Sequence, residues 1–352
     1  MKWVGQLDVP ISQFISVMRI FCLLFSLLLL HSLNAQVKYD YNWMLGYDSN
    51  SMEPGGEGSL IDFNMSPIAV FFNPKELNMR TANITMSDEI GNLVFYSNGC
   101  EIYNANDELM ENGDSINPGE VHELQCETGY TVLQSMIGLP FPENDSLFFL
   151  LHQHIVYLTN PFEPKIDKLL YTIINRNMND GMGEVIEKNS IAIADTLWPG
   201  ELTAVQHSNG KDWWIISPLD LQNKYYSLLL NTNGLSDAEE QTIGMSVSNS
   251  GEGSGQAGFS PDGFKYARYN KTDQVYLFAF DRTSGQLSNF QHLMIADTAF
   301  SGGLAFSPNS RFLYISSLWY IYQFDLWATD IQASKKLVAT WDGYEENGVF
   351  DT

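Results

Sequence analysis

Histidines are the residues of this chain whose type and spacing first suggest metal chemistry. His152 and His154 form a His-x-His pair in the run LLHQHIVYL. Alternation along a strand would place both imidazoles on one face, where they could ligate Zn²⁺. The alternative is that both are ordinary polar strand positions, because no third ligand is evident, and we predict no resident metal. His122 and His292 have no recognisable partner, and His207 lies in a predicted turn.

Acidic and aromatic side chains suggest a second kind of site, in which carboxylates cleave a sugar derivative and aromatic rings hold it. Glu101 and Glu201 lie in or beside predicted strands and could face a shared channel. The pairs Trp213-Trp214 and Trp319-Tyr320 could stack on sugar rings, or pack between sheets instead. Solvent exposure or turn formation accounts equally well for the other candidate acids, Asp88, Glu184 and Asp262.

No motif supports serine chemistry or phosphate binding. The glycine-rich segment GEGSGQAG, residues 251–258, lacks the G-x-S-x-G spacing of a nucleophile elbow and precedes a predicted strand, where an elbow precedes a helix. No GK[ST] follows it, so it is not a phosphate-binding loop. We therefore predict a loop between sheets, no catalytic residue and no cofactor.

The chain is strongly acidic, with 18 Lys and Arg residues against 42 Asp and Glu residues. Such a surface repels nucleic-acid phosphates and anionic lipid headgroups, so neither is a predicted partner. The acidity favours solubility, with weak divalent-cation binding as the alternative. Apolar residues make up 44% of the chain and aromatic residues 13%, which is enough to form a core and argues against disorder.

Residues 1–35 are predicted to be a secretory signal peptide. An apolar run, FCLLFSLLLL, follows Arg19 and precedes HSLNAQ, which matches a basic n-region, a short h-region and cleavage after Ala35. The run is shorter than the roughly 20 residues of a membrane-spanning helix. Membrane insertion of the mature chain is therefore not predicted, and its expected location is secreted or on the outer surface. Met18 is an alternative start.

Two cysteines remain after the predicted cleavage, Cys100 and Cys126, because Cys22 leaves with the signal peptide. An exported protein can keep a disulfide, but spacing alone cannot bring two sulfur atoms within bonding distance. A disulfide and two free thiols therefore both remain open. There is no CxxC motif and no zinc-ligand spacing.

Beyond the signal peptide the sequence predicts short strands and no long amphipathic helix. Runs rich in β-branched and aromatic residues alternate with Gly, Asn, Asp, Ser and Pro, which is typical of strands joined by turns. Several runs are almost entirely apolar, so both of their faces should be covered. The predicted strands are Asn92–Ser97, Ser146–Gln153, Lys168–Asn175, Asp212–Ser217, Lys224–Leu230, Gln274–Asp281 and Arg311–Ser317.

The strands repeat. Residues 256–289 and 303–331 both run from Phe-Ser-Pro through a turn and a strand to a second strand ending in Phe-Asp, and weaker copies lie at 202–236 and 84–109. A repeat of roughly 45 residues with four strands is the size of one β-propeller blade. Because one blade cannot cover both of its faces, several must close into a ring.

A turn between the strands gives the repeat its clearest signature. Proline presets the backbone, Ser and Asp can cap local amides, and Gly adopts the left-handed conformation. The residues assigned to these blade turns are Phe259, Pro261, Asp262, Gly263, Phe306, Pro308 and Asn309.

Residues 36–352 are thus predicted to form an all-β domain, a β-propeller of four-stranded blades. The repeat length predicts about seven blades, with six as the alternative and the last one incomplete. We expect a propeller truncated at its C-terminal end, or else one whose last sheet is closed by an early strand from residues 43–64.

Several segments resemble secreted β-propellers of the Bacteroidota. They are GNLVFYSNGCEIYNANDELMENG (91–113), LTAVQHSNGKDWWIIS (202–217), the FSPDG and FSPNS turns, and VATWDGYE (338–345). The resemblance implies an exported, WD-repeat-like or YVTN-like propeller of a kind that often precedes a C-terminal domain linked to gliding motility or type IX secretion. It supplies no catalytic residues to transfer, and Cys100 departs from the apolar residue usual at its position.

Two functions follow as hypotheses. The first is a non-catalytic propeller that serves as a cell-surface or secreted platform for an unidentified protein or glycan. Other domains of a longer secreted polypeptide are a further possible partner. The alternative is a propeller hydrolase, glycosidase-like or lactonase-like, with a site in the central channel. Three or more inward carboxylates or histidines around one channel mouth would favour the hydrolase.

Overall fold

A computed structural model describes residues 37–47, 58–79, 81–159, 162–247, 255–272, 274–297, 302–343, 345–346 and 349–350. The predicted signal peptide, its cleavage site and the alternative start lie outside the described residues. The chain divides into two compact units, residues 1–38 and 39–352. Within the described ranges, no helix has the length and apolarity needed to cross a membrane.

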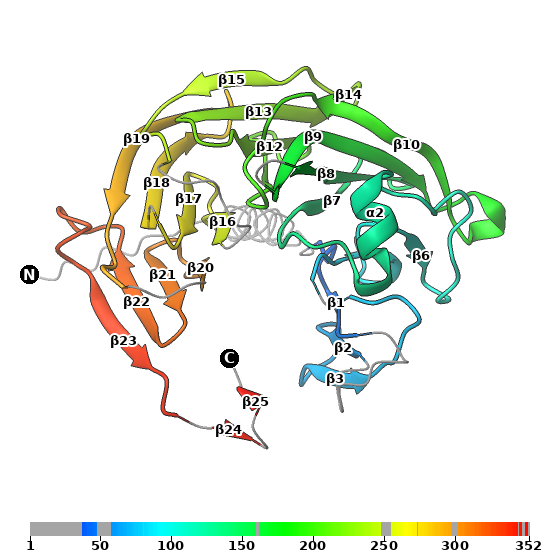
Figure 1. Cartoon of the computed structure of the whole chain (residues 1–352), viewed down its shortest axis with the longest axis horizontal. Helices are drawn as coiled ribbons and strands as arrows, with labels where there is room; N and C mark the ends of the chain where they lie inside the picture. The colour runs from blue at the N-terminus through cyan, green and yellow to red at the C-terminus, as the bar shows by residue number, and fades with distance from the viewer. Residues whose placement is uncertain are drawn as a thin grey trace, which may run out of the picture. The chain divides into compact units, whose positions relative to one another are not determined.

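Six β-sheets, here called blades 1 to 6, follow one another along the second unit (Figure 1). Every pairing within them is antiparallel between neighbouring strands. The strands are, for blade 1, β1 (Asn42–Leu45), β2 (Ser59–Asp62) and β3 (Ala69–Phe72); for blade 2, β4 (Ile84–Ser87), β5 (Leu93–Ser97) and β6 (Ile102–Asn104); for blade 3, β7 (Met136–Pro140), β8 (Leu147–Thr159), β9 (Phe162–Asn175) and β10 (Glu184–Ile193); for blade 4, β11 (Thr203–Gln206), β12 (Trp213–Pro218), β13 (Lys224–Asn231), β14 (Gly234–Leu235) and β15 (Glu239–Thr242); for blade 5, β16 (Gly255–Phe259), β17 (Lys265–Asn270), β18 (Gln274–Asp281) and β19 (Gln286–Leu293); for blade 6, β20 (Gly302–Phe306), β21 (Phe312–Ser317), β22 (Tyr320–Asp325) and β23 (Lys336–Thr340).

In four of the five steps along the chain, the first strand of a blade lies beside the first strand of the next. Such contacts join β1 to β4, β4 to β7, β11 to β16, and β16 to β20. The sheets therefore radiate from a common centre formed by their first strands, as Figure 1 shows for the coloured ribbon. This arrangement confirms the all-β propeller predicted from the sequence.

The predicted number of about seven four-stranded blades is wrong, because the described residues form six blades of three to five strands. Blade 3 alone occupies residues 136–193, with strands of 13 and 14 residues in its central hairpin. Between β6 and β7 the chain forms no further strand but the helix α2 (Glu120–Gln125) and the 3-10 turn η1 (Cys126–Thr128). A period of 45 residues therefore overcounts the blades. A short hairpin, β24 (Glu345–Glu346) and β25 (Val349–Phe350), follows blade 6.

The seven strands predicted from apolar runs are all present. They correspond to β5, β8, β9, β12, β13, β18 and β21, with ends shifted by a few residues. The largest difference is in blade 3, where β8 continues to Thr159 and β9 begins at Phe162.

The two Phe-Ser-Pro turns of blades 5 and 6 use the same hydrogen bonds. Ser260 Oγ donates to Asp262 Oδ1 at 2.6 Å, and the equivalent Ser307 Oγ donates to Asn309 Oδ1 at 2.7 Å. Gly263 has φ +75°, in the left-handed region that glycine adopts without steric cost. The serine of each turn thus closes its hairpin through a side-chain hydrogen bond to the residue two positions later.

The phenylalanines and prolines of these turns divide between core and solvent. Phe259 packs edge-on against Phe280 with ring centroids 4.9 Å apart, and Phe306 packs against the core between blades 5 and 6. Pro261 and Pro308 are exposed.

Separate blades, or the segments that lead into them, are joined by glutamine side chains, which we call the seam glutamines. Gln134 reaches from the segment before blade 3 to β16 of blade 5. Gln134 Nε2 donates to the Ala257 carbonyl at 2.6 Å, while its Oε1 accepts from the Ala257 amide at 2.8 Å. The side-chain amide thereby pairs with both backbone groups of one residue, as a neighbouring antiparallel strand would. The other seam glutamines, which bind backbone groups of an adjacent blade or its lead-in segment, are Gln153, Gln241, Gln256 and Gln332.

Blade 1 covers only one of its two faces. Met44 is 3% exposed and packs into a core with residues of blade 2 and the segment before it. On the opposite face, Trp43 and Leu45 are 49% and 41% exposed, and the paired edge-strand residues Val70 and Phe72 are 67% and 72% exposed. We call these four residues the outer face of blade 1.

Candidate functional site

One candidate site is a trough on blade 6, with a volume of about 580 Å³. Its floor is one cross-strand row in which Gly303 faces Ser316, Ser316 faces Ile321, and Ile321 faces Ala339. Small side chains at three of these four positions lower the sheet surface locally. The small side chains in this row therefore account for the trough, which runs across the four strands of the blade.

Two indole rings form the end of this trough. Trp319 and Trp341 lie 4.8 Å apart between ring centroids, and the Trp341 amide donates to the Trp319 carbonyl at 2.8 Å. Trp319 is 38% exposed. Tyr320 and the hydroxyl-bearing Ser317 and Thr340 also line the trough, and the rest of its lining is Gly302 and the apolar Leu133 and Leu318. Aromatic faces beside hydroxyl groups suit a ligand that presents both C–H surfaces and polar groups.

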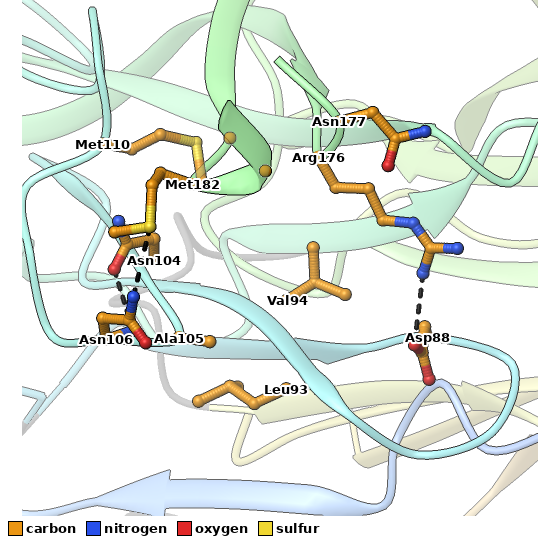
Figure 2. A pocket seen from close by; sticks show the side chains of 12 residues that line it. Asp88, Leu93, Val94, Asn104, Ala105, Asn106, Met110, Arg176, Asn177 and Met182 are labelled. Atoms are coloured by element: carbon orange, nitrogen blue, oxygen red, sulfur yellow. Dashed lines mark hydrogen bonds and ion pairs between the residues drawn. The ribbon is translucent and has the colours of Figure 1, made fainter. Parts of the chain in front are cut away.

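A second, smaller pocket of about 230 Å³ lies between blades 2 and 3 (Figure 2). Leu93 and Val94 of β5 lie on one side, and the turn between β9 and β10 brings Met182 over the other. Asn106 Nδ2 donates to the Met182 sulfur at 3.2 Å, which fixes that turn to blade 2. Figure 2 shows Arg176 at the far end, reaching Asp88.

Arg176 in this pocket is already surrounded by carboxylates. Its Nη1 lies 3.2 Å from Asp88, and its Nη2 lies 3.7 Å from Asp145 and 4.0 Å from Glu89. Asp88 also accepts hydrogen bonds from the Ile90 and Asn92 amides. The guanidinium is thus held in a structural ion network and does not offer an uncompensated charge to an anion.

The most strongly buried charges lie between blades 4 and 5. Glu201 Oε2 and Arg268 Nε are 2.5 Å apart, and each side chain is only 1% exposed. The guanidinium carbon lies 4.7 Å from the Trp198 ring centroid and 5.9 Å from that of Tyr225. Burial is the largest influence and disfavours the charged guanidinium, but the Glu201 carboxylate and the neighbouring Tyr225 and Tyr266 together outweigh it, so the pKa of Arg268 is raised.

This charge pair is enclosed and cannot meet a substrate. Tyr225 and Tyr266 are fully buried beside it, and burial raises the pKa of both phenols. Glu201 has φ +55°, a left-handed conformation that is uncommon outside glycine. The pair fixes the lead-in to β11 against β17, so Glu201, considered as a channel-facing acid, serves a structural role instead.

The histidine pair of β8 forms hydrogen bonds rather than a metal site. His152 is fully buried, and its Nδ1 lies 2.7 Å from Asn117 Oδ1 while Nε2 lies 3.0 Å from the Thr172 hydroxyl. Both nitrogens of His154 are also engaged, with Asp167 at 2.6 Å and the Pro118 carbonyl at 2.9 Å. The strand-position interpretation accounts for both residues.

Burial, with a smaller contribution from His154, lowers the pKa of His152 to about 3. The imidazole is therefore neutral at physiological pH. Because the Asn117 oxygen can only accept, the proton resides on His152 Nδ1 and Nε2 accepts from Thr172.

The remaining predicted candidates are scattered over the unit. Glu101 is half-buried at the end of the β5–β6 turn, and Glu184 begins β10, far along the chain from Glu101. His207 lies in a turn, with its Nε2 3.2 Å from the Thr283 carbonyl, and His292 stacks edge-on against Tyr276. The structure bonds Cys100 to Cys126, with Cα atoms 5.8 Å apart.

Sequence inspection missed two of these features. Trp341 was not paired with Trp319, because twenty-one residues and two strands, β22 and β23, separate them. Arg268 was not considered as the partner of Glu201, since the two belong to different repeats. A charged residue inside the otherwise apolar and aromatic run of β17, KYARYN, is the signal that could have indicated a buried ion pair.

No protein-family model and no curated protein matches the chain. Solved structures of similar fold include a candidate 6-phosphogluconolactonase from Bacteroides fragilis, with 14% identity, a TM-score of 0.40 and coverage of 85% of this chain and 94% of that one. The periplasmic gluconolactonase PpgL of Pseudomonas aeruginosa has 14% identity, a TM-score of 0.45 and coverage of 81% and 76%. The β-propeller domain of Cps50 from Myceliophteria thermophila has 10% identity, a TM-score of 0.42 and coverage of 82% of each chain. The assignment as a β-propeller rests on the sheet topology of the chain itself.

Proposed function

We propose that this chain is an exported, non-catalytic β-propeller of the bacterial cell surface and that it binds an extracellular glycan. The observation that carries the proposal is the trough of blade 6, which two adjacent indole rings line together with small and hydroxyl-bearing residues. Export is supported by the predicted signal peptide, and a surface location by the resemblance to secreted propellers of the Bacteroidota.

The trough favours a glycan over a charged ligand. None of the residues that line it is ionisable at neutral pH, since its polar groups are the hydroxyls of Ser316, Ser317, Thr340 and Tyr320. Sugar rings present axial C–H groups to an indole face and hydroxyls to such side chains. At about 580 Å³ the trough has the volume of sites that hold small ligands, so a few sugar units would fill it.

The hydrolase hypothesis has less support in the described residues. A glycosidase needs two carboxyl groups on either side of the scissile bond. Glu201, predicted as an acid that could face the channel, is paired with Arg268, and its side chain is 1% exposed. The trough of blade 6 is lined by no carboxylate.

The test is a glycan array followed by calorimetric titration of any hit. Replacing Trp319 by Ala removes a stacking surface of about 1.5 kcal/mol, which corresponds to about tenfold weaker binding. Trp327 is the matched control, because it is a 66% exposed tryptophan on the same blade that does not line the trough. We expect W319A and W341A to lose affinity and W327A to keep it.

Two results would contradict the proposal. One is an array without a hit, together with wild-type protein that binds apolar peptides in the trough. The other is a glycan whose binding falls equally in W327A. Release of reducing ends from a bound glycan would instead support the hydrolase.

A further inference from the structure

Three potential metal ligands meet beside α2. The sulfur atoms of Cys100 and Cys126 and a ring nitrogen of His122 all lie within 4.8 Å of one another. They come from separate segments: Cys100 from the β5–β6 turn, His122 from α2, and Cys126 from the start of η1. Cysteine and histidine are the ligands that Zn²⁺ prefers in proteins.

Local structure orients two of these ligands toward the third. His122 and Cys126 are four residues apart across α2 and the start of η1, so they share one face of the helix. Cys100 is held on the opposite side by Asn98, whose Oδ1 accepts from the Cys100 amide at 3.0 Å and the Glu101 amide at 3.3 Å. The backbone on both sides is therefore fixed independently of the sulfur atoms.

His122 carries the hydrogen bond that metal-binding histidines usually have. Its Nδ1 lies 2.8 Å from the Ile116 carbonyl oxygen, which can only accept. The proton is therefore on Nδ1 and the lone pair on Nε2, and a backbone carbonyl in this position fixes the ring orientation for a metal.

In the structure the two sulfurs are bonded to each other, so this state cannot bind a metal through thiolates. We propose that reduction converts Cys100, His122 and Cys126 into a zinc site with an open fourth position. An external dithiol supplies the two electrons and is itself oxidised to a disulfide. The Cys100–Cys126 bond breaks, and Cys100 and Cys126 each become a thiol. Binding of Zn²⁺ then releases both thiol protons, leaving two thiolate ligands and the His122 Nε2.

The required movement is small. In a tetrahedral site with ordinary zinc bond lengths, ligand atoms lie about 3.5–3.8 Å apart. The sulfurs need only separate from bonding distance, because His122 is already within 4.8 Å of both. The disulfide of the oxidised protein and the metal of the reduced protein would thus both connect α2 and η1 to blade 2.

The experiment is a titration of Co²⁺ into the full chain, first oxidised and then reduced with dithiothreitol and desalted without oxygen. We expect one equivalent of Co²⁺ to give thiolate charge-transfer bands and tetrahedral d–d bands in the reduced protein only, and Zn²⁺ to displace it. The surface carboxylates can bind Co²⁺ only through oxygen, so they give neither signal.

Variants assign the ligands. H122A should bind Co²⁺ at least tenfold more weakly, whereas H207A, a histidine in a turn of blade 4, should behave as wild type. The pair C100S/C126S should lose the charge-transfer bands. A reduced protein without these bands would overturn the site, as would an H122A titration that matches wild type.

Reduction could unfold the segment around α2 before any metal is added. Circular dichroism then provides the test. Addition of Co²⁺ or Zn²⁺ should then restore the spectrum of the oxidised protein and raise the melting temperature of the reduced one. A reduced chain that remains unfolded with metal present would equally contradict the proposal.

Discussion

The junction between blades 4 and 5 and the outer face of blade 1 show opposite solutions to the covering of a sheet. At the junction, Glu201 and Arg268 are enclosed at 1% exposure among tyrosines and a tryptophan. On the outer face of blade 1, Val70 and Phe72 are more than two-thirds exposed. The more apolar surface is thus the exposed one, and the charged residues are buried.

The difference teaches that the hydrophobicity of a blade face does not decide whether it is covered. Position in the ring decides, because a blade with neighbours on both sides buries whatever its faces carry. Charged groups can remain in such a junction only as a pair, since an isolated buried charge is costly. Apolar residues on an end face remain exposed unless another sheet packs against them.

Breaking the buried pair should produce the largest effect. Replacing Arg268 by Ala leaves the Glu201 carboxylate buried without its partner, so we expect a loss of about 3–5 kcal/mol in unfolding free energy. Chemical denaturation measures it. The matched control is R311A, which removes a solvent-exposed partner of Asp325 and should change stability little.

An Arg268 variant as stable as wild type would show that the junction does not depend on charge. Replacing both residues, as in the double variant E201L/R268M, sharpens the test, because the pair is removed without leaving a lone ion. We expect the double variant to be more stable than R268A.

A second buried polar network should respond to acid. His152 has a pKa lowered to about 3, against about 6.5 in an unfolded chain. The unfolded chain therefore takes up a proton first, and stability that is complete above pH 6.5 falls progressively down to pH 3. We expect a loss of about 2 kcal/mol at pH 5, measured by denaturation at several pH values.

The carboxylates of the chain also titrate in this range, so the comparison is between variants. H152N should lack this component of the pH dependence, whereas H207N, in a turn of blade 4, should keep it. Identical pH profiles for wild type and H152N would exclude a role for His152 in acid sensitivity.

The outer face of blade 1 should show the smallest effect on stability. The double variant V70T/F72S should stay within about 0.5 kcal/mol of wild type, because both side chains are already in water. On the covered face of the same sheet, M44A should cost about 2–5 kcal/mol. Denaturation measures both, and binding of a hydrophobic dye should fall in V70T/F72S.

Sedimentation of the same variants would sharpen the comparison. A wild-type dimer that V70T/F72S converts to monomer would mean that a second copy covers this face. The predicted C-terminal truncation stays a prediction, and a longer native polypeptide with a further sheet on this face would support it.

The fold was predictable where a residue acts through its neighbours in sequence. Runs such as QVYLFAFD fold as strands because adjacent side chains alternate between covered faces, and Ser260 closes its turn through Asp262, two residues away. Blade count was not predictable from a fixed period, because the hairpin of β8 and β9 is far longer than the others.

The sites were predictable only in part, because their residues meet across blades. Trp319 was a candidate for sugar stacking, but its partner Trp341 lies beyond two strands, β22 and β23. Glu201 was a candidate for chemistry, and only the fold reveals Arg268 beside it. Nothing in a single sequence marks Gln134 as different from a polar residue at a strand end.

The seam glutamines have a consequence for the medium in which the protein can work. An amide carries no net charge and does not titrate, so dissolved ions neither screen its hydrogen bonds nor compete through protonation. Gln134 and Gln241 bind the backbone of blade 5 in this way, and Gln153 binds the backbone of the segment that leads into blade 4. The blades should therefore stay joined as well in brine as in fresh water.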